Sequence, residues 1–248
     1  MIPTSPTIRG ALNELRSRIE RMATKGHSRA VLPFGVAEVD AVLPAGGLTL
    51  GAVHEVSDGG AEGWRASLSP LFAAGILARI PGPVLWCLHS RDLFAPGLAR
   101  VGLHPDRLIY CETWKDAEVL PAMEDGLRHR GLAGVVGELT RLPLAASRRL
   151  QLAAEQSGVV AFVVRRSGAQ LDEANAAFSR WRISPTPSPD EDGLGLGRAH
   201  WNLELLRCRG AESQSWIVEA PDASGFISLP PQLSHGSFAK GKEERASA

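Results

Sequence analysis

The sequence predicts an α/β domain in which helices flank a mostly parallel β-sheet. Between residues 84 and 164, apolar runs of strand length alternate with segments whose apolar residues recur at helical spacing. Such alternation predicts parallel strands joined by right-handed crossovers. After residue 180, strand-like runs follow with no helix between the last two. This pattern predicts antiparallel edge strands near the C-terminus.

The composition is that of a globular protein with one substantial core. Of the 248 residues, 44% are hydrophobic and 22% are charged, and the formal net charge is zero. The net charge of the chain therefore does not attract it to nucleic acid or to an anionic membrane, and any such contact must involve a local group of charged residues. No apolar run approaches the roughly 20 residues that span a bilayer, and the N-terminus lacks the apolar centre of a signal peptide. We expect a cytoplasmic protein.

The three cysteines favour reduced thiols. Cys87, Cys111 and Cys208 are odd in number and far apart, and two of them lie in apolar strand-like runs. This spacing suits neither a disulfide framework nor a metal site. The sequence therefore predicts no bound metal.

Residues 1–30 are predicted to form an amphipathic helix and a linker. Apolar residues recur at spacings of four, three, four and three, which is the pattern of one helical stripe. The stripe consists of Ile8, Leu12, Leu15, Ile19 and Met22. Charged residues occupy much of the remaining surface, so the stripe must be buried against something. Two alternatives stay open: docking on the protein's own core, or docking on a partner or neighbouring subunit.

The core is predicted to span residues 31–229. Strands are expected at residues 51–57, 84–88, 107–111, 132–136 and 159–164. A helix is expected after the first of these strands, and others at residues 94–101, 114–130 and 144–157. The closing strands are expected at residues 181–183, 200–208 and 215–219. Residues 185–197, rich in proline, glycine and acid, are expected to form a mobile loop, and residues 230–248 a disordered tail.

A glycine-rich turn after the first strand occupies the place of a phosphate-binding loop. Such a loop has the pattern G-x-x-x-x-G-K-[ST], in which backbone amides and the lysine hold phosphates and the hydroxyl holds Mg²⁺. With Gly63 as the second glycine, Asp58 takes the place of the first. Trp64 then stands at the lysine position and Arg65 at the hydroxyl position. The degenerate loop consists of Asp58, Gly59, Gly60, Gly63, Trp64 and Arg65.

These substitutions remove the chemistry of nucleotide binding. Asp58 would bring negative charge toward phosphates, Trp64 has no ammonium group, and Arg65 has no hydroxyl for a metal. We therefore expect no cofactor, no metal and no catalytic residue in this turn. Altered nucleotide binding, with Arg65 as the surviving phosphate ligand, is the alternative.

The stretch LPFGVAEVDAVLPAGGLTLGAVHEV, the alternating core and the closing strands WNLELLRCRG and SWIVEA together resemble the RecA-like recombinase core. More closely, they resemble the ImuA family, the RecA-related component of bacterial inducible-mutagenesis cassettes. The resemblance covers about residues 32–219, and the first stretch is its specific part. It implies a RecA-like core for this chain.

The resemblance also implies where the acids of a RecA-like ATPase would lie. The position of the catalytic glutamate falls near Ser90, so no glutamate can be carried over. The acid that closes the Walker B strand falls at Glu138, but no hydroxyl stands opposite it to complete a metal site. The segments that match the family's two mobile DNA-binding loops are short. A RecA-type filament that grips DNA through those loops is therefore not expected.

Arginines after the fourth and fifth core strands are candidates for contact with DNA phosphates. The candidates are Arg141, Arg148, Arg149, Arg165 and Arg166. A solvated or acid-paired surface is the alternative, and the zero net charge favours it.

The resemblance implies a non-catalytic RecA-like adaptor in SOS-induced, error-prone translesion DNA synthesis. Its expected partners are ImuB, a Y-family polymerase homologue, and the error-prone polymerase III α-subunit of the same cassette. RecA is a further candidate partner, and contact with DNA is expected to be weak or indirect. Two alternatives remain, an ATP-dependent RecA paralogue and a cell-division inhibitor that resembles SulA.

Overall fold

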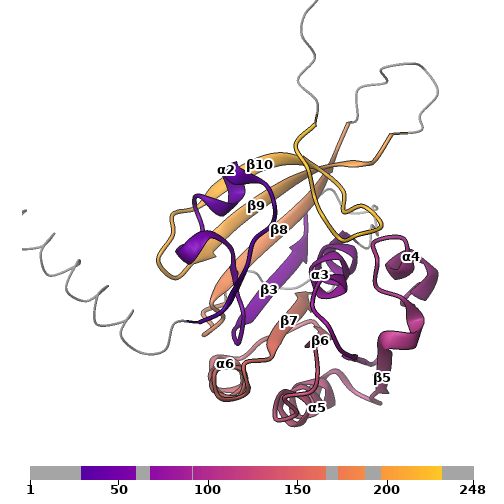
Figure 1. Cartoon of the computed structure of the whole chain (residues 1–248). Coiled ribbons are helices and arrows are strands. Elements are labelled where there is room, and N and C mark those ends of the chain that lie inside the picture. Colours follow the sequence, from indigo (N-terminus) through magenta and orange to yellow (C-terminus); the bar gives the residue numbers. More distant parts are fainter. Residues whose placement is uncertain (1–28, 60–67, 91, 166–172, 188–196, 231–248) are drawn as a thin grey trace, which may run out of the picture.

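The computed structural model describes residues 29–59, 68–90, 92–165, 173–187 and 197–230. Within these ranges the chain forms an eight-stranded sheet of order β10-β9-β8-β3-β7-β6-β4-β5 (Figure 1). The strands are β3 (Val53–Asp58), β4 (Val84–Leu88), β5 (Leu108–Glu112), β6 (Gly134–Leu139), β7 (Val160–Arg165), β8 (Ser179–Thr186), β9 (His200–Cys208) and β10 (Gln214–Glu219). Strands β3 to β8 pair in parallel, while β9 and β10 pair antiparallel. The predicted fold class is confirmed.

Helices cover both faces of the parallel part of the sheet (Figure 1). They are α3 (Leu68–Ala78), α4 (Ala95–Ala99), α5 (Asp116–Leu127) and α6 (Leu144–Ser157). On one face, Phe72 of α3 belongs to the same core cluster as Trp86 of β4. On the other face, Met123 of α5 and Leu150 of α6 pack in a cluster with Val135 of β6. Because side chains alternate along each strand, the sheet divides the apolar core into two layers.

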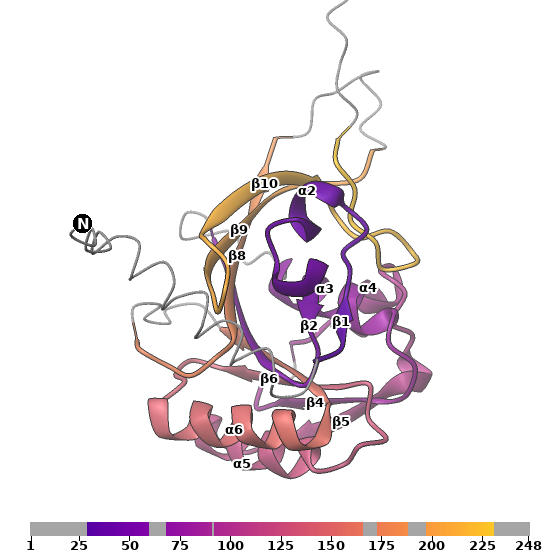
Figure 2. The ribbon, with the colours of Figure 1, turned by 60° about the vertical axis from the view of Figure 1, so that its left-hand side comes forward.

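A short segment before β3 lies inside the curve formed by β8, β9 and β10 (Figure 2). It contains β1 (Val31–Leu32), α2 (Ala37–Asp40), the 3₁₀ turn η1 (Pro44–Gly46) and β2 (Leu48–Thr49). The carboxylate of Asp40 accepts hydrogen bonds from the N–H groups of Phe34 and Gly35, at 2.7 and 3.0 Å. The Phe34 ring lies 6.0 Å from that of Phe72 and 5.6 Å from that of Trp181, centroid to centroid. This segment thus closes the core on the α3 side.

A buried histidine joins the N-terminal segment to two strands of the sheet. The Nε2 atom of His54 donates to the carbonyl oxygen of Thr49 at 2.8 Å. Its Nδ1 atom therefore accepts from the Ser179 hydroxyl, 2.6 Å away, and the Trp181 indole donates to the same Ser179 oxygen. Burial lowers the pKa of His54 to about 4, so the ring is neutral at physiological pH. The ring of His54 therefore has a structural role.

The closing strands refine two predictions. Trp201 of β9 and Trp216 of β10 are buried. However, β8 pairs with β3 in parallel, so antiparallel pairing begins between β8 and β9. Strand β8 also extends to Thr186, into the predicted loop at residues 185–197.

Several predictions lie outside the described residues. These are the helix within residues 1–28, most of the loop at residues 188–196 and the tail at residues 231–248. Among the residues that the structure does describe, no helix is both long and apolar enough to cross a bilayer.

The three cysteines are free thiols. Cys87 and Cys111 are register partners on the neighbouring strands β4 and β5. Burial raises the pKa of the Cys87 thiol well above its ordinary value, and it raises the pKa of Cys208 to about 11. Both thiols are therefore protonated at neutral pH, which makes them weak nucleophiles and poor metal ligands.

Candidate functional site

The first candidate site lies where β3 ends and α3 begins. Asp58 is the last residue of β3, and its Oδ1 atom accepts hydrogen bonds from the N–H and the hydroxyl of Ser69, both at 2.7 Å. Burial raises the pKa of Asp58, and the hydrogen bonds from Ser69 oppose that shift. Ser69 belongs to the first turn of α3, where unpaired N–H groups and the helix dipole attract anions. The chain's own carboxylate thus binds the helix end at which a phosphate would bind.

The backbone amide of Gly59 is hydrogen-bonded within the sheet and does not form part of a phosphate-binding loop. Its N–H donates to the carbonyl oxygen of Ile183 at 2.7 Å, which continues the pairing between β3 and β8. A Cβ atom on Gly59 would collide with the side chains of Arg182 and Ser184 on β8. The pairing with β8 explains the direction of the amide, and a larger residue at this position would have to displace the side chains of Ser184 and Arg182.

Glu138 lies near the end of β6, at the same carboxyl edge of the parallel strands. Its side chain is buried and accepts a hydrogen bond of 2.7 Å from the indole Nε1 of Trp86 on β4. Parallel α/β sheets commonly bind ligands at this edge. Here, however, Asp58 and Glu138 both accept hydrogen bonds from the chain itself.

Other predicted positions lie outside the described residues. From the degenerate loop these are Gly60, Gly63, Trp64 and Arg65. The apolar stripe Ile8, Leu12, Leu15, Ile19 and Met22 and the candidate DNA contact Arg166 also lie outside.

Arg165 is not at the surface, contrary to what a contact with DNA would need. Its side chain is fully buried, and its Nη1 atom lies 3.3 Å from Oε1 of Glu55. The other oxygen of Glu55 accepts from Nε of Arg180 at 2.6 Å and from Nδ2 of Asn175 at 2.8 Å. A buried carboxylate therefore pairs with guanidinium groups from β7 and β8, which is the acid-paired alternative to a phosphate contact.

The remaining described candidates for DNA contact are exposed arginines near α6. Arg141 lies 3.6 Å from Glu173, and Nε of Arg149 lies 3.0 Å from an oxygen of Glu124. Arg148 is exposed on the same helix. Acid pairing of Arg141 and Arg149 reduces their net attraction for phosphates.

An open sheet edge forms a second candidate site. Strand β5 is the last strand of the sheet, and no described residue pairs with its outer side (Figure 1). Two of its side chains, Ile109 and Tyr110, are 49% and 43% exposed, and Phe94 and Trp114 nearby in the sequence are 72% and 94% exposed. Apolar side chains at an unprotected edge are typical of a surface that binds another chain. Ile109 and Tyr110 are consecutive in β5, so their side chains point to opposite faces of the sheet at this edge. We use the name β5-edge surface for these four residues together.

This surface was not predicted from the sequence. Ile109 and Tyr110 belong to a strand that was expected to lie in the core, and Phe94 and Trp114 stand at the start of predicted helices. Which strand lies at the edge depends on strand order, and strand order is not visible in periodicity. The feature of the sequence that could have indicated this surface is the presence of large aromatic residues that do not belong to the apolar repeat of their helix or strand.

The comparisons with known proteins agree with the resemblance. Over 206 residues, the chain is 40% identical to "Protein ImuA" of Caulobacter vibrioides strain NA1000 / CB15N, which covers 78% of this chain and 84% of the relative. The same values hold for "Protein ImuA" of Caulobacter vibrioides strain ATCC 19089 / CIP 103742 / CB 15. No protein-family model matches the chain. Identity at this level over most of both chains shows that this protein belongs to the ImuA family.

Proposed function

We propose that this protein is a non-catalytic, RecA-like adaptor in SOS-induced, error-prone translesion DNA synthesis. Membership of the ImuA family supports a role in inducible mutagenesis. The proposed partners are an ImuB-like Y-family polymerase homologue and an error-prone polymerase III α-subunit, with RecA as a further candidate. The protein acts in the cytoplasm, and its contact with DNA is weak or indirect, in keeping with the acid-paired arginines.

The main support for the absence of nucleotide-dependent catalysis in this proposal is the pair of hydrogen bonds between Asp58 and Ser69. A phosphate at the amino end of α3 would need the same N–H donors that Asp58 uses. It would also meet a negative charge, and two like charges about 4 Å apart repel by about 4 kcal/mol at an effective dielectric constant of about 20. Nucleotide binding is therefore disfavoured by both lost donors and repulsion.

Isothermal titration calorimetry with ATP and Mg²⁺ tests this part. We expect no saturable binding by the wild type up to about 1 mM ATP. The variant Asp58→Gly/Trp64→Lys/Arg65→Thr restores the G-x-x-x-x-G-K-T pattern, and we expect it to gain binding. The matched control Trp64→Lys/Arg65→Thr keeps Asp58 and should remain without binding.

Two outcomes would contradict the proposal. Saturable binding of ATP by the wild type would favour the ATP-dependent paralogue. Equal binding by the double and triple variants would show that Asp58 does not block the helix end.

The adaptor part is supported by the β5-edge surface. An adaptor needs an exposed apolar surface whose burial by a partner stabilises the complex. Trp114 and Phe94 are among the most exposed large apolar side chains of the described residues. The open backbone of β5 can pair with an added strand, while the aromatic side chains fill pockets on that partner. We place the ImuB-like partner on this edge.

Substitution of one edge residue tests the placement. Ile109→Ser should weaken co-purification with the ImuB-like partner by about tenfold, because an exposed apolar side chain of this size contributes about 1–2 kcal/mol when a partner covers it. Ile217→Ser on β10 is the matched control, since Ile217 is 46% exposed and lies on the opposite edge of the sheet. Equal loss in both variants would argue against β5. Co-purification with the tubulin-like division protein in place of a polymerase would support the SulA-like alternative.

A further inference from the structure

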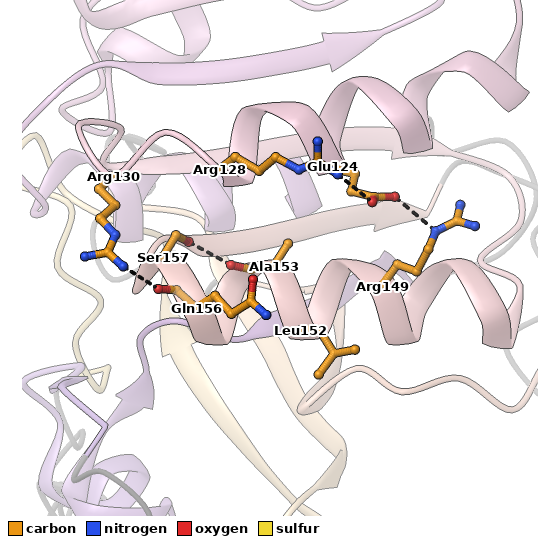
Figure 3. Close-up of a pocket in the computed structure, with 8 residues that line it drawn as sticks. All are labelled: Glu124, Arg128, Arg130, Arg149, Leu152, Ala153, Gln156 and Ser157. Atoms are coloured by element: carbon orange, nitrogen blue, oxygen red, sulfur yellow. Dashed lines mark hydrogen bonds and ion pairs between the residues drawn. The ribbon is translucent and has the colours of Figure 1, made fainter.

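A polar cleft lies between α5 and α6, on the face of the sheet opposite α3 (Figure 3). Its volume is about 340 Å³. The residues that shape it are Glu124, Arg128, Arg130, Arg149, Leu152 and Gln156. These side chains come from the end of α5, the turn that follows it, and α6. The cleft shares no residue with the Asp58 site or with the β5-edge surface.

Three guanidinium groups line the cleft against one carboxylate. Nη2 of Arg128 donates to one oxygen of Glu124 at 3.2 Å, and Nε of Arg149 donates to the other at 3.0 Å. Arg130 donates to the carbonyl oxygen of Gln156 at 3.1 Å, near the end of α6. A guanidinium has five N–H donors, and these bonds use one donor of each, while Nη1 of Arg128 also lies 3.5 Å from an oxygen of Asp125, outside the cleft lining. The lining therefore carries a net positive charge and retains capacity for further acceptors.

The geometry of the two outer arginines suits a carboxylate. Both already pair with Glu124 from opposite sides (Figure 3). The side chains of Arg128 and Arg149 are 66% and 59% exposed, so these ion pairs are screened and weak, and an incoming carboxylate can compete for them. Arginine is the side chain best suited to hold carboxylates in this planar manner.

An exposed apolar side chain lies in the same cleft. Leu152 of α6 is 57% exposed and lines the cleft together with the polar groups. A phosphodiester backbone cannot bury a leucine, whereas a peptide with an apolar side chain can. Asp125, which pairs with Arg128 at 3.5 Å, and Glu124 would also repel a continuous run of phosphates. These features favour an acidic peptide over DNA.

We propose that the cleft between α5 and α6 binds an acidic segment of a partner protein. Carboxylates of the segment pair with Arg128 and Arg149, and an apolar side chain of the segment covers Leu152. The inference goes beyond the adaptor role, since it adds a docking surface on different elements from β5.

Fluorescence anisotropy with the full-length chain tests the proposal. The probe is a short fluorescein-labelled peptide with glutamates on both sides of one leucine. The wild type should bind it, and Arg128→Gln/Arg149→Gln should lower the affinity by about tenfold. Glu124→Gln should raise the affinity by about threefold, because it removes the competing carboxylate. Arg148→Gln is the control, matched to the single variant Arg149→Gln: it removes one positive charge from the neighbouring position of α6, outside the cleft, and should leave the affinity unchanged.

The outcomes separate the proposal from general attraction between charges. No binding of the peptide by a folded wild type would overturn it, as would equal losses in Arg148→Gln and in the double variant. Tighter binding of single-stranded DNA than of the peptide, lost in the double variant, would assign the cleft to nucleic acid instead. Thermal unfolding of each variant confirms that it is folded, which the exposure of the substituted side chains leads us to expect.

Discussion

Asp58 and His54 lie on the same strand, and the groups they touch decide what each can do. Asp58 could be recognised in the sequence as the wrong residue for a phosphate loop. Its bond to Ser69 could not, because the residues between them form no repeat that would position the helix end. The partner of His54, Ser179, is distant in the sequence, and their contact depends on the pairing of β3 with β8, which the sequence does not reveal.

The neutral state of His54 predicts a dependence of stability on pH. The pKa of about 4 in the folded protein lies below the ordinary 6.5, so the unfolded chain binds more protons between these values. Stability is therefore complete above about pH 6.5 and falls as the pH is lowered toward 4, by about 3 kcal/mol in total. Urea unfolding at about pH 7 and about pH 4.5 measures this loss.

The variant His54→Gln is the control for the pH dependence. It should be less stable than the wild type at neutral pH, because its amide cannot reproduce both bonds of the ring. It should lose less free energy of unfolding between the two pH values. Equal losses in both proteins would show that another group causes the acid sensitivity.

At the scale of elements, long periodic segments were predictable and short ones were not. The strands at residues 84–88 and 200–208 and the helix at residues 144–157 have the predicted bounds. Strands β1 and β2 contain two residues each, too few to show an alternation. The cleft between α5 and α6 was missed because it depends on how the two helices pack across the sheet.

The Glu55 cluster holds three neighbouring strands together. Glu55 of β3 pairs with Arg165 of β7 and Arg180 of β8, and the side chains are almost fully buried. Replacement by Glu55→Leu leaves guanidinium charges in the interior, and we expect a loss of about 3–5 kcal/mol in the free energy of unfolding. Urea unfolding measures it, and the double variant Glu55→Leu/Arg165→Met should recover part of the loss. No recovery would mean that the pair is not coupled.

At the scale of the whole molecule, the two edges of the sheet differ in character. Residues after β10 return to its outer side, where the N–H of Glu219 donates to the carbonyl oxygen of Ser228 at 2.8 Å. At the other end, β5 carries exposed aromatic and aliphatic side chains. The sequence predicted the strands and their alternation, whereas this asymmetry appears only once the strand order is known.

Removal of residues 1–24 tests the apolar stripe of the N-terminal segment. The truncated protein should keep its core, because described residues after position 29 form both apolar clusters of the sheet. Its binding to the ImuB-like partner should weaken if the stripe Ile8, Leu12, Leu15, Ile19 and Met22 docks on that partner. A pull-down with the folded truncated protein measures this. Unchanged affinity would refute docking of the stripe on that partner.

The carboxylate at the start of α3 has one more consequence. A bound nucleotide leaves when its concentration falls or when it is hydrolysed, but Asp58 is part of the polypeptide and stays in place. Under the proposed non-catalytic role, the charge at this helix end does not change with the supply of nucleotide in the cell. An assembly formed through the proposed adaptor would then not be released by nucleotide hydrolysis, and its lifetime would depend on synthesis, dilution and proteolysis of its components.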